Sequence, residues 1–492
     1  MVAHSDLTAG NSLLEMEARR PGQAPLRVFA SPRLTPPAEV IAALERIASL
    51  PVLSGPVVAL PDLHHKPQLE CPSSVATASA NHIVLGLSSP STHCGMALAR
   101  TTLHESDLDA AALDALFGEL ILRLSLERQQ PVLSLPEMAD VLLRGAAAAI
   151  ERYDLEPSVL DFMEQRGNAL PADTDVEAIQ QAIPQALWQI GGWEFALVGK
   201  GNHFLEIQTI DQIHDAATAR AWNLEMGQIG IMYHADSGHL GALVGRLYAH
   251  RRKNTWRGRL REWRLKAPFH LRTGKTSRLL HRLAYHLAPR ALTPMPADSE
   301  EGQRTLLALA AAGNYAYANR LAVLAALRDA LCAVWGKSSP APSLLWDTPH
   351  NGIRRETIEG NELWLHRHNT ARALPPSQMP ADSPFARTGQ PVLLPGTDRT
   401  SSYLCVAGEG TGRTLYSVDH GAGRSALQLG RPLEKGAATR RYTYERGPIE
   451  VRPHLSDEGI DEVLGVLQAH DIARPVVRLR PLAVLKAEKA KS

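Results

Sequence analysis

Histidine, cysteine and carboxylate side chains recur in short segments of the sequence, and their types suit metal and phosphate chemistry. Thiolate, neutral imidazole and carboxylate are the ligand types of manganese, zinc and iron sites. A single histidine of this kind is more often a hydrogen-bonded structural residue, so a metal site requires several segments to converge. The segments are PDLHH (61–65), THCG (92–95), GNHFLEI (201–207), MYHADSG (232–238), TPHNG (348–352) and DHGAGR (419–424).

Several of these residues directly follow strand-like runs. His234 follows the run QIGIMY, and Asp419 and His420 follow the apolar pair SV. Ligands at the ends of strands converge well in folds that mix helices and sheets. The glycines after His420 form a turn whose backbone N–H groups can approach a phosphate. The pattern therefore favours a site for metal and phosphate at the strand ends.

The elements that must position these residues follow from hydrophobic periodicity. Helices are predicted near Pro37–Leu50 and at 107–130, 136–152, 302–335 and 457–470. Strands are predicted at 57–60, 82–87, 195–199, 204–210, 228–233, 363–366, 391–394, 402–408, 414–418 and 476–486. Their irregular interleaving predicts a mixed α/β fold of the α+β kind rather than a doubly wound sheet.

Length and composition exclude several classes of protein. The chain has 492 residues, of which 44% are apolar and 21% charged, so it is not mostly disordered. Its four cysteines show no CxxC spacing, and the first thirty residues do not resemble a secretory signal. We therefore expect no disulfide framework and a cytoplasmic location. No run approaches eighteen apolar residues, so no membrane association is expected.

One segment of the chain is strongly basic. Between Arg246 and Arg290, fourteen Lys or Arg residues oppose one acid, Glu262, although the whole chain has a net charge of only +1. Trp256 and Trp263 lie inside the segment. Such a surface can neutralise phosphates and stack on bases, which favours nucleic-acid contact. A solvated surface insertion is the alternative.

The order of the motifs resembles that of the RtcB-type RNA ligases over roughly residues 50–488. PDLH resembles the family's PDxHxG segment, HCGM its NCG motif, GNHFLEI its GNHF-x-E signature and YHADSGHLG its HSGSRGLG segment. Further along, NYAYANR resembles NYAxANR, HRHNTARALP resembles HRKGATRAFP, and GQPVLLPGTDRTSSYL, DHGAGR and VVRLRPLAVLK have counterparts in the same order. GNHF followed by HGAGR is the most specific part of the match.

The resemblance implies an activity and an organisation for the chain. The expected activity joins an RNA 3′-phosphate or 2′,3′-cyclic phosphate to a 5′-hydroxyl in RNA repair or tRNA splicing. It would use GTP, one or two Mn²⁺ ions and a guanylyl-histidine intermediate, with an activating partner protein as a further expectation. The expected organisation is an N-terminal extension (1–50) and one RtcB-like catalytic unit (51–492) with a basic insertion at about 246–290. Irregular sheets surrounded by helices are the implied fold.

The resemblance also assigns roles to individual residues. It implies that Cys94 bridges two ions and that His203, His234 and His350 are the histidine ligands. His420 aligns with the nucleophile that attacks GTP, and Asp62 with an acidic active-site residue. The positions that align with guanylate contacts are Asn202, Phe204, Glu206, Asn351, Pro395, Gly396, Thr397, Asp398, Ser402, Gly421, Ala422, Gly423 and Lys486.

The sequence departs from the family pattern in ways that mark a divergent member. The family has an aspartate three residues before the bridging cysteine, and Ser91 occupies that position here. A hydroxyl is a weaker ligand than a carboxylate, so we expect one metal position to bind less tightly and Ser91→Asp to strengthen it. Asp62, His65 and His93 are the candidates to replace the missing ligand.

Two alternatives to ligation remain open. The first is an RNA-end-binding paralogue that has lost ligation because the metal site at Ser91 is broken. The second is a metal-dependent phosphoesterase on the same scaffold. The retained His420, Cys94 and three histidines favour the ligase.

Overall fold

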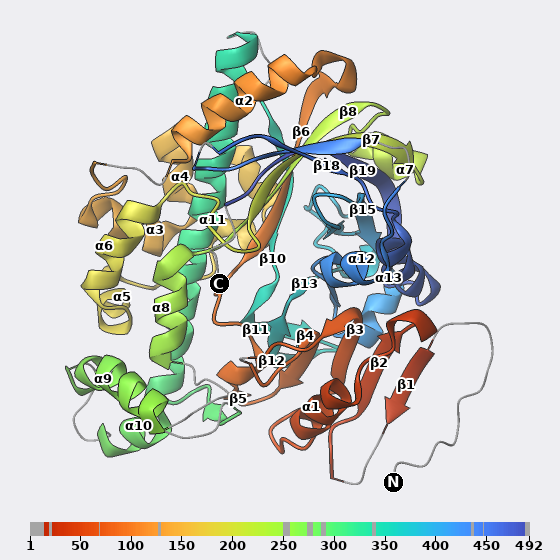
Figure 1. The fold of residues 1–492 in the computed structure, drawn as a ribbon. Coiled ribbons are helices and arrows are strands. Elements are labelled where there is room, and N and C mark those ends of the chain that lie inside the picture. The colour runs from red at the N-terminus through yellow and green to blue at the C-terminus, as the bar shows by residue number, and fades with distance from the viewer. Residues whose placement is uncertain are drawn as a thin grey trace.

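The computed structural model describes residues 14–18, 22–67, 69–125, 129–248, 256–272, 279–286, 292–336, 341–433, 437–445 and 447–487. Helices and sheets are mixed, and a long helix, α11, stands between a group of helices and the main sheet (Figure 1). The predicted mixed α/β fold is confirmed. The α-helices are α1 (Ala38–Ala48), α2 (Ala110–Arg123), α3 (Leu135–Arg144), α4 (Ala146–Tyr153), α5 (Val176–Ala182), α6 (Gln185–Glu194), α7 (Ala216–Ala221), α8 (Gly238–Tyr248), α9 (Trp256–Arg272), α10 (Leu279–His286), α11 (Glu300–Trp335), α12 (Gly423–Leu429) and α13 (Glu458–Ala469).

The strands form two large sheets. A nine-stranded sheet has the order β10-β6-β8-β7-β19-β15-β14, with β17 and β18 attached beside β19, and a six-stranded sheet has the order β1-β2-β3-β4-β12-β11. β13 pairs with β16, and β5 pairs with β9. The strands are β1 (Leu14–Ala18), β2 (Leu26–Ala30), β3 (Val57–His64), β4 (Ser73–Ser79), β5 (His82–Ile83), β6 (Gly95–His104), β7 (Phe204–Ile213), β8 (Gln228–Ala235), β9 (Met295–Pro296), β10 (Ser343–Pro349), β11 (Asn351–Ile358), β12 (Asn361–His368), β13 (Thr370–Arg372), β14 (Pro391–Leu394), β15 (Ser402–Ala407), β16 (Ser417–Asp419), β17 (Ala438–Tyr442), β18 (Glu450–Pro453) and β19 (Ala473–Leu485).

The helix α11 organises the helical half of the molecule. Ser299 caps its first turn by accepting a hydrogen bond from Gly302 N (3.0 Å), and Gly336 ends it at φ 87°. Alanines fill much of its length, so α2, α3, α4, α5 and α8 pack closely around it. The resulting core also includes alternate residues of β6, β7 and β8, and α11 therefore supports one face of the nine-stranded sheet.

The opposite face of this sheet is the one available for function. In β7, Leu205 and Ile207 enter the core on the α11 side, whereas Phe204 and Glu206 point to the other face and line a cavity. This division follows from the two-residue repeat of a strand. The segment GNHFLEI therefore serves stability and function at alternate positions.

Most predicted elements are confirmed, and one predicted strand is wrong. Residues 195–199 form a buried loop instead, in which Ala196 has φ 58° and Gly199 φ 102°. The Asn319 side chain of α11 forms hydrogen bonds with both backbone groups of Leu197 in this loop, accepting from its N (3.2 Å) and donating to its O (2.8 Å). The apolar run is buried because it faces α11, and a side-chain amide provides the hydrogen bonds that a sheet would otherwise supply.

Three other predictions need adjustment. The helix predicted at 136–152 is two helices, because the backbone of Gly145 has φ 59°, which is not helical. Glycine is required there, since a Cβ atom would lie only 2.3 Å from Gly167 O. The strand predicted at 82–87 stops at Ile83 and continues as a 3-10 turn. The strand predicted at 414–418 starts only at Ser417, because the two residues before it have positive φ.

Candidate active site

Neighbouring strands of the nine-stranded sheet bring the metal-type side chains to one edge. Strand β6 lies between β10 and β8, and its first residue, Gly95, pairs with Pro349 on one side and Ala235 on the other. Cys94 precedes β6, His350 follows β10, and His234 lies near the end of β8. His203 precedes Phe204, which pairs with His234 across β7 and β8. The register of antiparallel strands thus gathers residues that lie up to 256 positions apart in the chain.

The ligand atoms lie at distances typical of one metal cluster. Cys94 Sγ is 2.9 Å from His234 Nε2 and 3.3 Å from His203 Nε2. His234 Nε2 is 3.3 Å from His350 Nε2. With bonds of about 2.0–2.3 Å, the ligands of a tetrahedral ion lie about 3.3–3.7 Å apart. The four residues predicted as ligands therefore lie together, all of them buried.

A fifth potential ligand, Asp236, was not predicted from the sequence. Its Oδ2 lies 3.6 Å from His203 Nε2, and Cys94, His203 and Asp236 form a second group of potential ligands. Asp236 comes two residues after His234, so both side chains point to the same face at the end of β8. This two-residue spacing is the signal that could have identified Asp236.

The cluster has the electrostatics of a cation site. Burial lowers the pKa of His234 and His350 well below the ordinary value, so both imidazoles are neutral and offer lone pairs. Burial raises the pKa of the Cys94 thiol, and the Asp236 carboxylate raises it further. A divalent cation would reverse this second effect by stabilising the thiolate. Buried neutral imidazoles, a thiol and a carboxylate therefore fit a divalent transition-metal ion.

His420 adjoins the metal cluster. Its ring centroid lies 4.6 Å from that of His350, and it directly follows β16. Burial lowers the pKa of His420 to about 3, with the Lys66 charge acting in the same direction. The imidazole is therefore neutral and has a lone pair available for nucleophilic attack.

Asp62 positions the glycine turn that follows His420. Its Oδ1 accepts hydrogen bonds from Ser425 N (2.8 Å) and Ser425 Oγ (2.6 Å) in the first turn of α12. Burial raises the pKa of Asp62 to about 6 even though these hydrogen bonds oppose the rise. Asp62 thus lies beneath the turn rather than in the metal cluster.

A cavity of about 530 Å³ opens beside His420 and His234. Its size is that of a small-molecule site. Cations outnumber carboxylates in its lining, and arginines 399, 441 and 452 were not predicted from the sequence. Its predicted lining residues are Asn202, Phe204, Glu206, His234, Pro395, Gly396, Thr397, Asp398, Ser402, His420, Gly421, Gly423 and Lys486.

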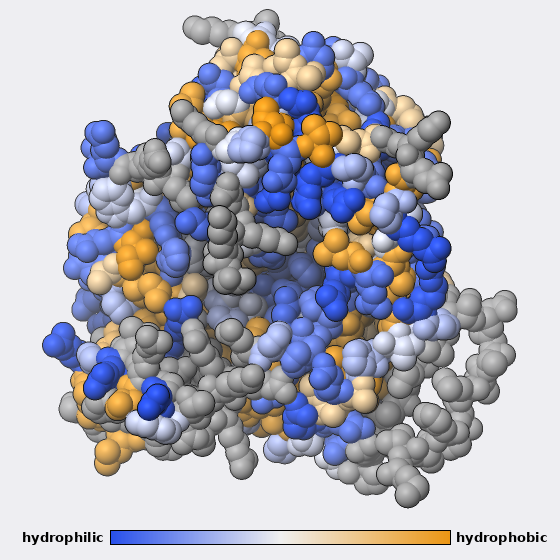
Figure 2. Space-filling view, viewed as in Figure 1, coloured by the Kyte–Doolittle hydropathy of each residue, from blue (hydrophilic) through white to orange (hydrophobic). Residues whose placement is uncertain are grey.

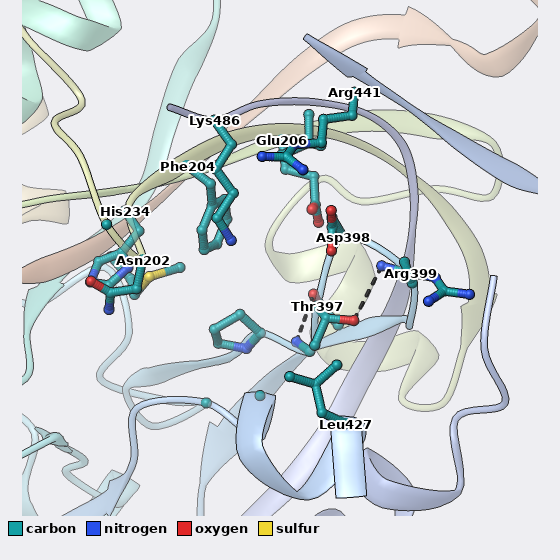
Figure 3. Close-up of a pocket in the computed structure, with 18 of the residues that line it drawn as sticks. Asn202, Phe204, Glu206, His234, Thr397, Asp398, Arg399, Leu427, Arg441 and Lys486 are labelled. Carbon is teal, nitrogen blue, oxygen red and sulfur yellow. Dashed lines mark hydrogen bonds between the residues drawn. The ribbon is translucent and has the colours of Figure 1, made fainter. Parts of the chain in front are cut away.

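The polar groups are distributed along the cavity. Asn202 and His234 lie at one end, Glu206, Asp398 and Arg441 lie at the other, and Phe204 and Lys486 lie between them (Figure 3). Burial raises the pKa of Glu206 to about 8, although Gln208 Nε2 donates to its Oε1 at 2.5 Å. The far end therefore holds a carboxyl group poised to accept hydrogen bonds from an occupant, and the near end adjoins the metal cluster.

Two of the predicted nucleotide contacts lie outside the described lining of this cavity. Asn351 Oδ1 accepts from Asn369 N (2.8 Å), so this amide orders the backbone near His420. The N–H of Ala422 donates to Pro395 O (2.9 Å) and joins the glycine turn to the loop after β14.

The candidates proposed to replace the missing aspartate are not in the cluster. Within the described ranges, neither Asp62, His65 nor His93 belongs to a group of three potential ligands. The His93 ring packs edge-on against Tyr317, with a centroid separation of 5.9 Å. Ser91 O accepts from Cys94 N (3.3 Å), so this residue shapes the turn before Cys94. Asp236 is the carboxylate that forms a group of potential ligands with Cys94 and His203.

The basic segment contributes the helices α9 and α10. Arg251, Arg252, Lys253 and Arg290 lie outside the described residues, and so does the side chain of Trp263. Trp256 is 70% exposed, and Arg257 lies 5.3 Å from its ring centroid. Lys266 and Arg282 are buried, and Arg282 Nε pairs with Glu301 at 3.0 Å. Only part of the positive charge is therefore available to a partner.

The face shown in Figure 2 is hollowed near its centre, and hydrophilic side chains gather around the hollow. None of the described helices is long and apolar enough to cross a membrane. All four cysteines are thiols.

Comparisons with known proteins agree with the geometry. The family model described as tRNA-splicing ligase RtcB matches residues 43–487. A tRNA-splicing ligase RtcB from Pyrococcus abyssi is 30% identical over 426 residues, which cover 80% of this chain but only 42% of that relative. The RNA-splicing ligase RtcB from Mycobacterium tuberculosis is 31% identical over 365 residues, which cover 71% of this chain and 76% of that relative. That of Thermococcus kodakarensis is 28% identical over 94% and 95% of the two chains. The chain belongs to the RtcB family.

Proposed function

We propose that this protein is a GTP- and manganese-dependent RNA ligase that joins a 3′-phosphate or 2′,3′-cyclic phosphate to a 5′-hydroxyl. The main observation in support is that a neutral His420 lies between a buried cysteine–histidine cluster and a cavity rich in cations. That arrangement suits the transfer of a nucleotidyl group from a nucleoside triphosphate to the histidine, with pyrophosphate as the leaving group. RNA with these two kinds of end would be the substrate, in RNA repair or tRNA splicing.

The first step is attack by a ring nitrogen of His420 on the α-phosphorus of GTP. An N–P bond forms, the bond to the β-phosphate oxygen breaks, and pyrophosphate leaves. Because the imidazole is already neutral, no base is needed to free its lone pair. Glu206 at the far end of the cavity would accept hydrogen bonds from the N–H edge of guanine, and Lys486 would donate to an oxygen.

The later steps use the same site. An oxygen of the RNA 3′-phosphate attacks the guanylate phosphorus, the N–P bond to His420 breaks, and a guanylate-capped RNA end results. The 5′-hydroxyl then attacks the 3′-phosphorus and GMP leaves. Divalent ions held by Cys94, His203, His234 and His350 would neutralise phosphate charge during these transfers.

The cysteines, the basic helix α9 and Asp236 bear on the location, the substrate and the alternatives. The four cysteine thiols are consistent with a reducing, cytoplasmic location. The exposed cations of α9 would hold the RNA, and an activating partner protein remains part of the proposal. The Asp236 carboxylate beside Cys94 and His203 supports a ligase over a ligation-deficient paralogue, and no separate feature of the described site favours a phosphoesterase.

The proposal is tested by incubating the protein with Mn²⁺ and GTP labelled at the α-phosphate. A protein adduct that is acid-labile and base-stable is expected, as is ligation of RNA that carries a 3′-phosphate and a 5′-hydroxyl. RNA with a 3′-hydroxyl and a 5′-phosphate is the matched control and should not be joined. Absence of both adduct and ligation would contradict the proposal.

A further inference from the structure

Two groups of potential ligands share Cys94. The first group adds His234 and His350, and the second adds His203 and Asp236. In each group the ligand atoms lie within 4.8 Å of one another, and all five residues are buried. A thiolate can bridge two cations because it carries negative charge between them. The arrangement is therefore that of two adjacent cation positions, each with ligands of its own.

The β6–β8 register places Asp236 directly beside Cys94. Gly95 of β6 pairs with Ala235 of β8, so Cys94, just before β6, faces Asp236, just after β8. Ser237 Oγ donates to Thr92 O (2.8 Å), which ties together the segments on either side of this pair. Asp236 reaches the cluster by strand pairing and is held there by a side-chain hydrogen bond, so its position does not depend on a loose loop.

The carboxylate of Asp236 is also oriented. Its Oδ1 accepts from Gly238 N at 2.7 Å, and its Oδ2 lies 3.6 Å from His203 Nε2. One oxygen is thus held by the backbone and the other points to the second group. Gly238 has φ 59°, so a glycine at this position allows the turn that supplies the N–H.

A buried arginine supports both segments from below. Arg320 NH1 donates to His93 O (3.0 Å) and to Ala235 O (3.4 Å), the residues just before Cys94 and Asp236. Arg320 itself is fixed by two hydrogen bonds to the Asp347 carboxylate, at 2.6 and 2.8 Å. The spacing between Cys94 and Asp236 is therefore set before any ion binds.

We propose that Asp236 is the carboxylate ligand of a second divalent cation, which it binds together with Cys94 and His203. This inference rests on the proposed function and specifies how the chain compensates for Ser91. A carboxylate oxygen is a hard donor suited to Mn²⁺, and it adds a negative charge that balances a second cation. The two positions differ in ligand chemistry, because only the second contains a carboxylate.

The test measures metal binding separately from ligation. Wild type and Asp236→Asn are titrated with Mn²⁺ by calorimetry, and the bound metal is counted after equilibrium dialysis. We expect two ions in wild type and, in Asp236→Asn, one tight ion with the second weakened at least about tenfold. The asparagine keeps the oxygen that accepts from Gly238 N, so the fold should be retained.

Two further variants make the result specific. His350→Asn removes a ligand of the first group only, so it should weaken the other ion and leave the Asp236 position filled. Asp62→Asn is the matched control, because Asp62 is also a buried carboxylate that accepts from a backbone N–H. It should still bind two ions.

Electron paramagnetic resonance supplies an independent readout. Two Mn²⁺ ions bridged by a thiolate should give an exchange-coupled signal in wild type, and Asp236→Asn should give the six-line signal of an isolated ion. Two tight ions in Asp236→Asn, one ion in wild type, or loss of the second ion in Asp62→Asn would each overturn the assignment. Failure of ligation with two ions bound would instead count against the proposed function.

Discussion

His420 is the residue on which covalent chemistry would depend, because its neutral ring adjoins both the cluster and the cavity. We predict that His420→Asn forms no detectable guanylate adduct, while its melting temperature stays close to that of wild type. His239→Asn is the control, since the His239 side chain is 72% exposed and lies outside the cavity lining. An adduct of normal yield in His420→Asn would place the nucleophile elsewhere.

Glu206 should make nucleotide binding depend on pH. In the free protein burial holds its pKa at about 8, so the carboxyl is mostly protonated at pH 7. Accepting two guanine N–H groups requires the carboxylate, and binding at lower pH must therefore release a proton. GTP affinity should rise by up to about tenfold per unit as the pH increases toward 8, and then level off. Isothermal titration between pH 6.5 and 8.5 measures this slope.

The control for this pH dependence is Glu206→Gln. The amide has the same shape and no proton to lose, so its GTP affinity should be weaker and nearly independent of pH. An identical slope in both proteins would assign the titration to another group.

At the scale of elements, the pair Arg320–Asp347 joins α11 to β10 beneath the metal cluster. Both side chains are fully buried and share two hydrogen bonds. Arg320→Met leaves a buried carboxylate without its partner, so the free energy of unfolding should fall by about 3–5 kcal/mol. Urea denaturation measures this loss, and Mn²⁺ titration should show weaker binding at both positions.

The matched control is Arg478→Met. Arg478 also binds a carboxylate through two hydrogen bonds, to Asp211 at 2.9 and 3.0 Å, but its side chain is 30% exposed. Removing the Arg478 guanidinium should lower the free energy of unfolding by about 1 kcal/mol or less. Equal losses in the two variants would mean that burial of the Arg320 pair has no special effect.

The helix α9 carries three exposed cations of the basic segment, Arg257, Arg264 and Arg272. Replacing all three with Gln should weaken RNA binding and reduce its salt dependence by about 0.7 in the logarithmic slope for each lost phosphate contact. Adduct formation with GTP should be unchanged, because α9 does not line the cavity. Filter binding at several salt concentrations measures the slope.

A triple variant of Arg166, Arg355 and Arg474 is the charge-matched control, since these side chains are 57–67% exposed and lie elsewhere. Equal effects of the two triple variants would show that only overall charge matters.

A second element of the segment, α10, has a structural role. Its Arg282 pairs with Glu301 of α11, and the positive charge there disfavours a cation beside His270 and His286.

At the scale of the whole molecule, the site is built where several elements meet. The nine-stranded sheet supplies the cluster and Glu206, the loop after β14 supplies Pro395–Asp398, and β16 with α12 supplies His420 and its turn. A ligand in the cavity therefore contacts parts of the fold that would separate on unfolding. We predict that Mn²⁺ with GTP raises the melting temperature, because a ligand at a hundred times its Kd adds about 2.7 kcal/mol.

Differential scanning fluorimetry measures this shift, with ATP as the matched ligand. ATP lacks the guanine N–H donors that Glu206 would bind, so its shift should be smaller. A shift of equal size for both nucleotides would remove Glu206 as the base-recognising group.

Most of the helices and strands that were predicted are present because apolar spacing reports burial, as in α11, β8 and β19, whereas helices such as α6 and α12 were not predicted. Residues 195–199 were wrongly predicted to be a strand for the same reason. They are apolar and buried, but the Asn319 side chain, not a neighbouring strand, forms hydrogen bonds with the backbone of Leu197. The family and the grouping of Cys94, His203, His234 and His350 were also predictable, since short motifs carry these residues in a fixed order.

The family, the mixed fold and the chemical types available at the site could be inferred from the order of residues alone. The carboxylate that lies beside the cluster is identified by the folded arrangement of the strands. Ser91 lies close to Cys94 in the chain, whereas Asp236 lies 142 positions away and becomes its neighbour through the pairing of β6 with β8. Strand register is set by contacts between distant segments, so the two-residue spacing from His234 indicates the face on which Asp236 lies but does not reveal that Cys94 lies opposite.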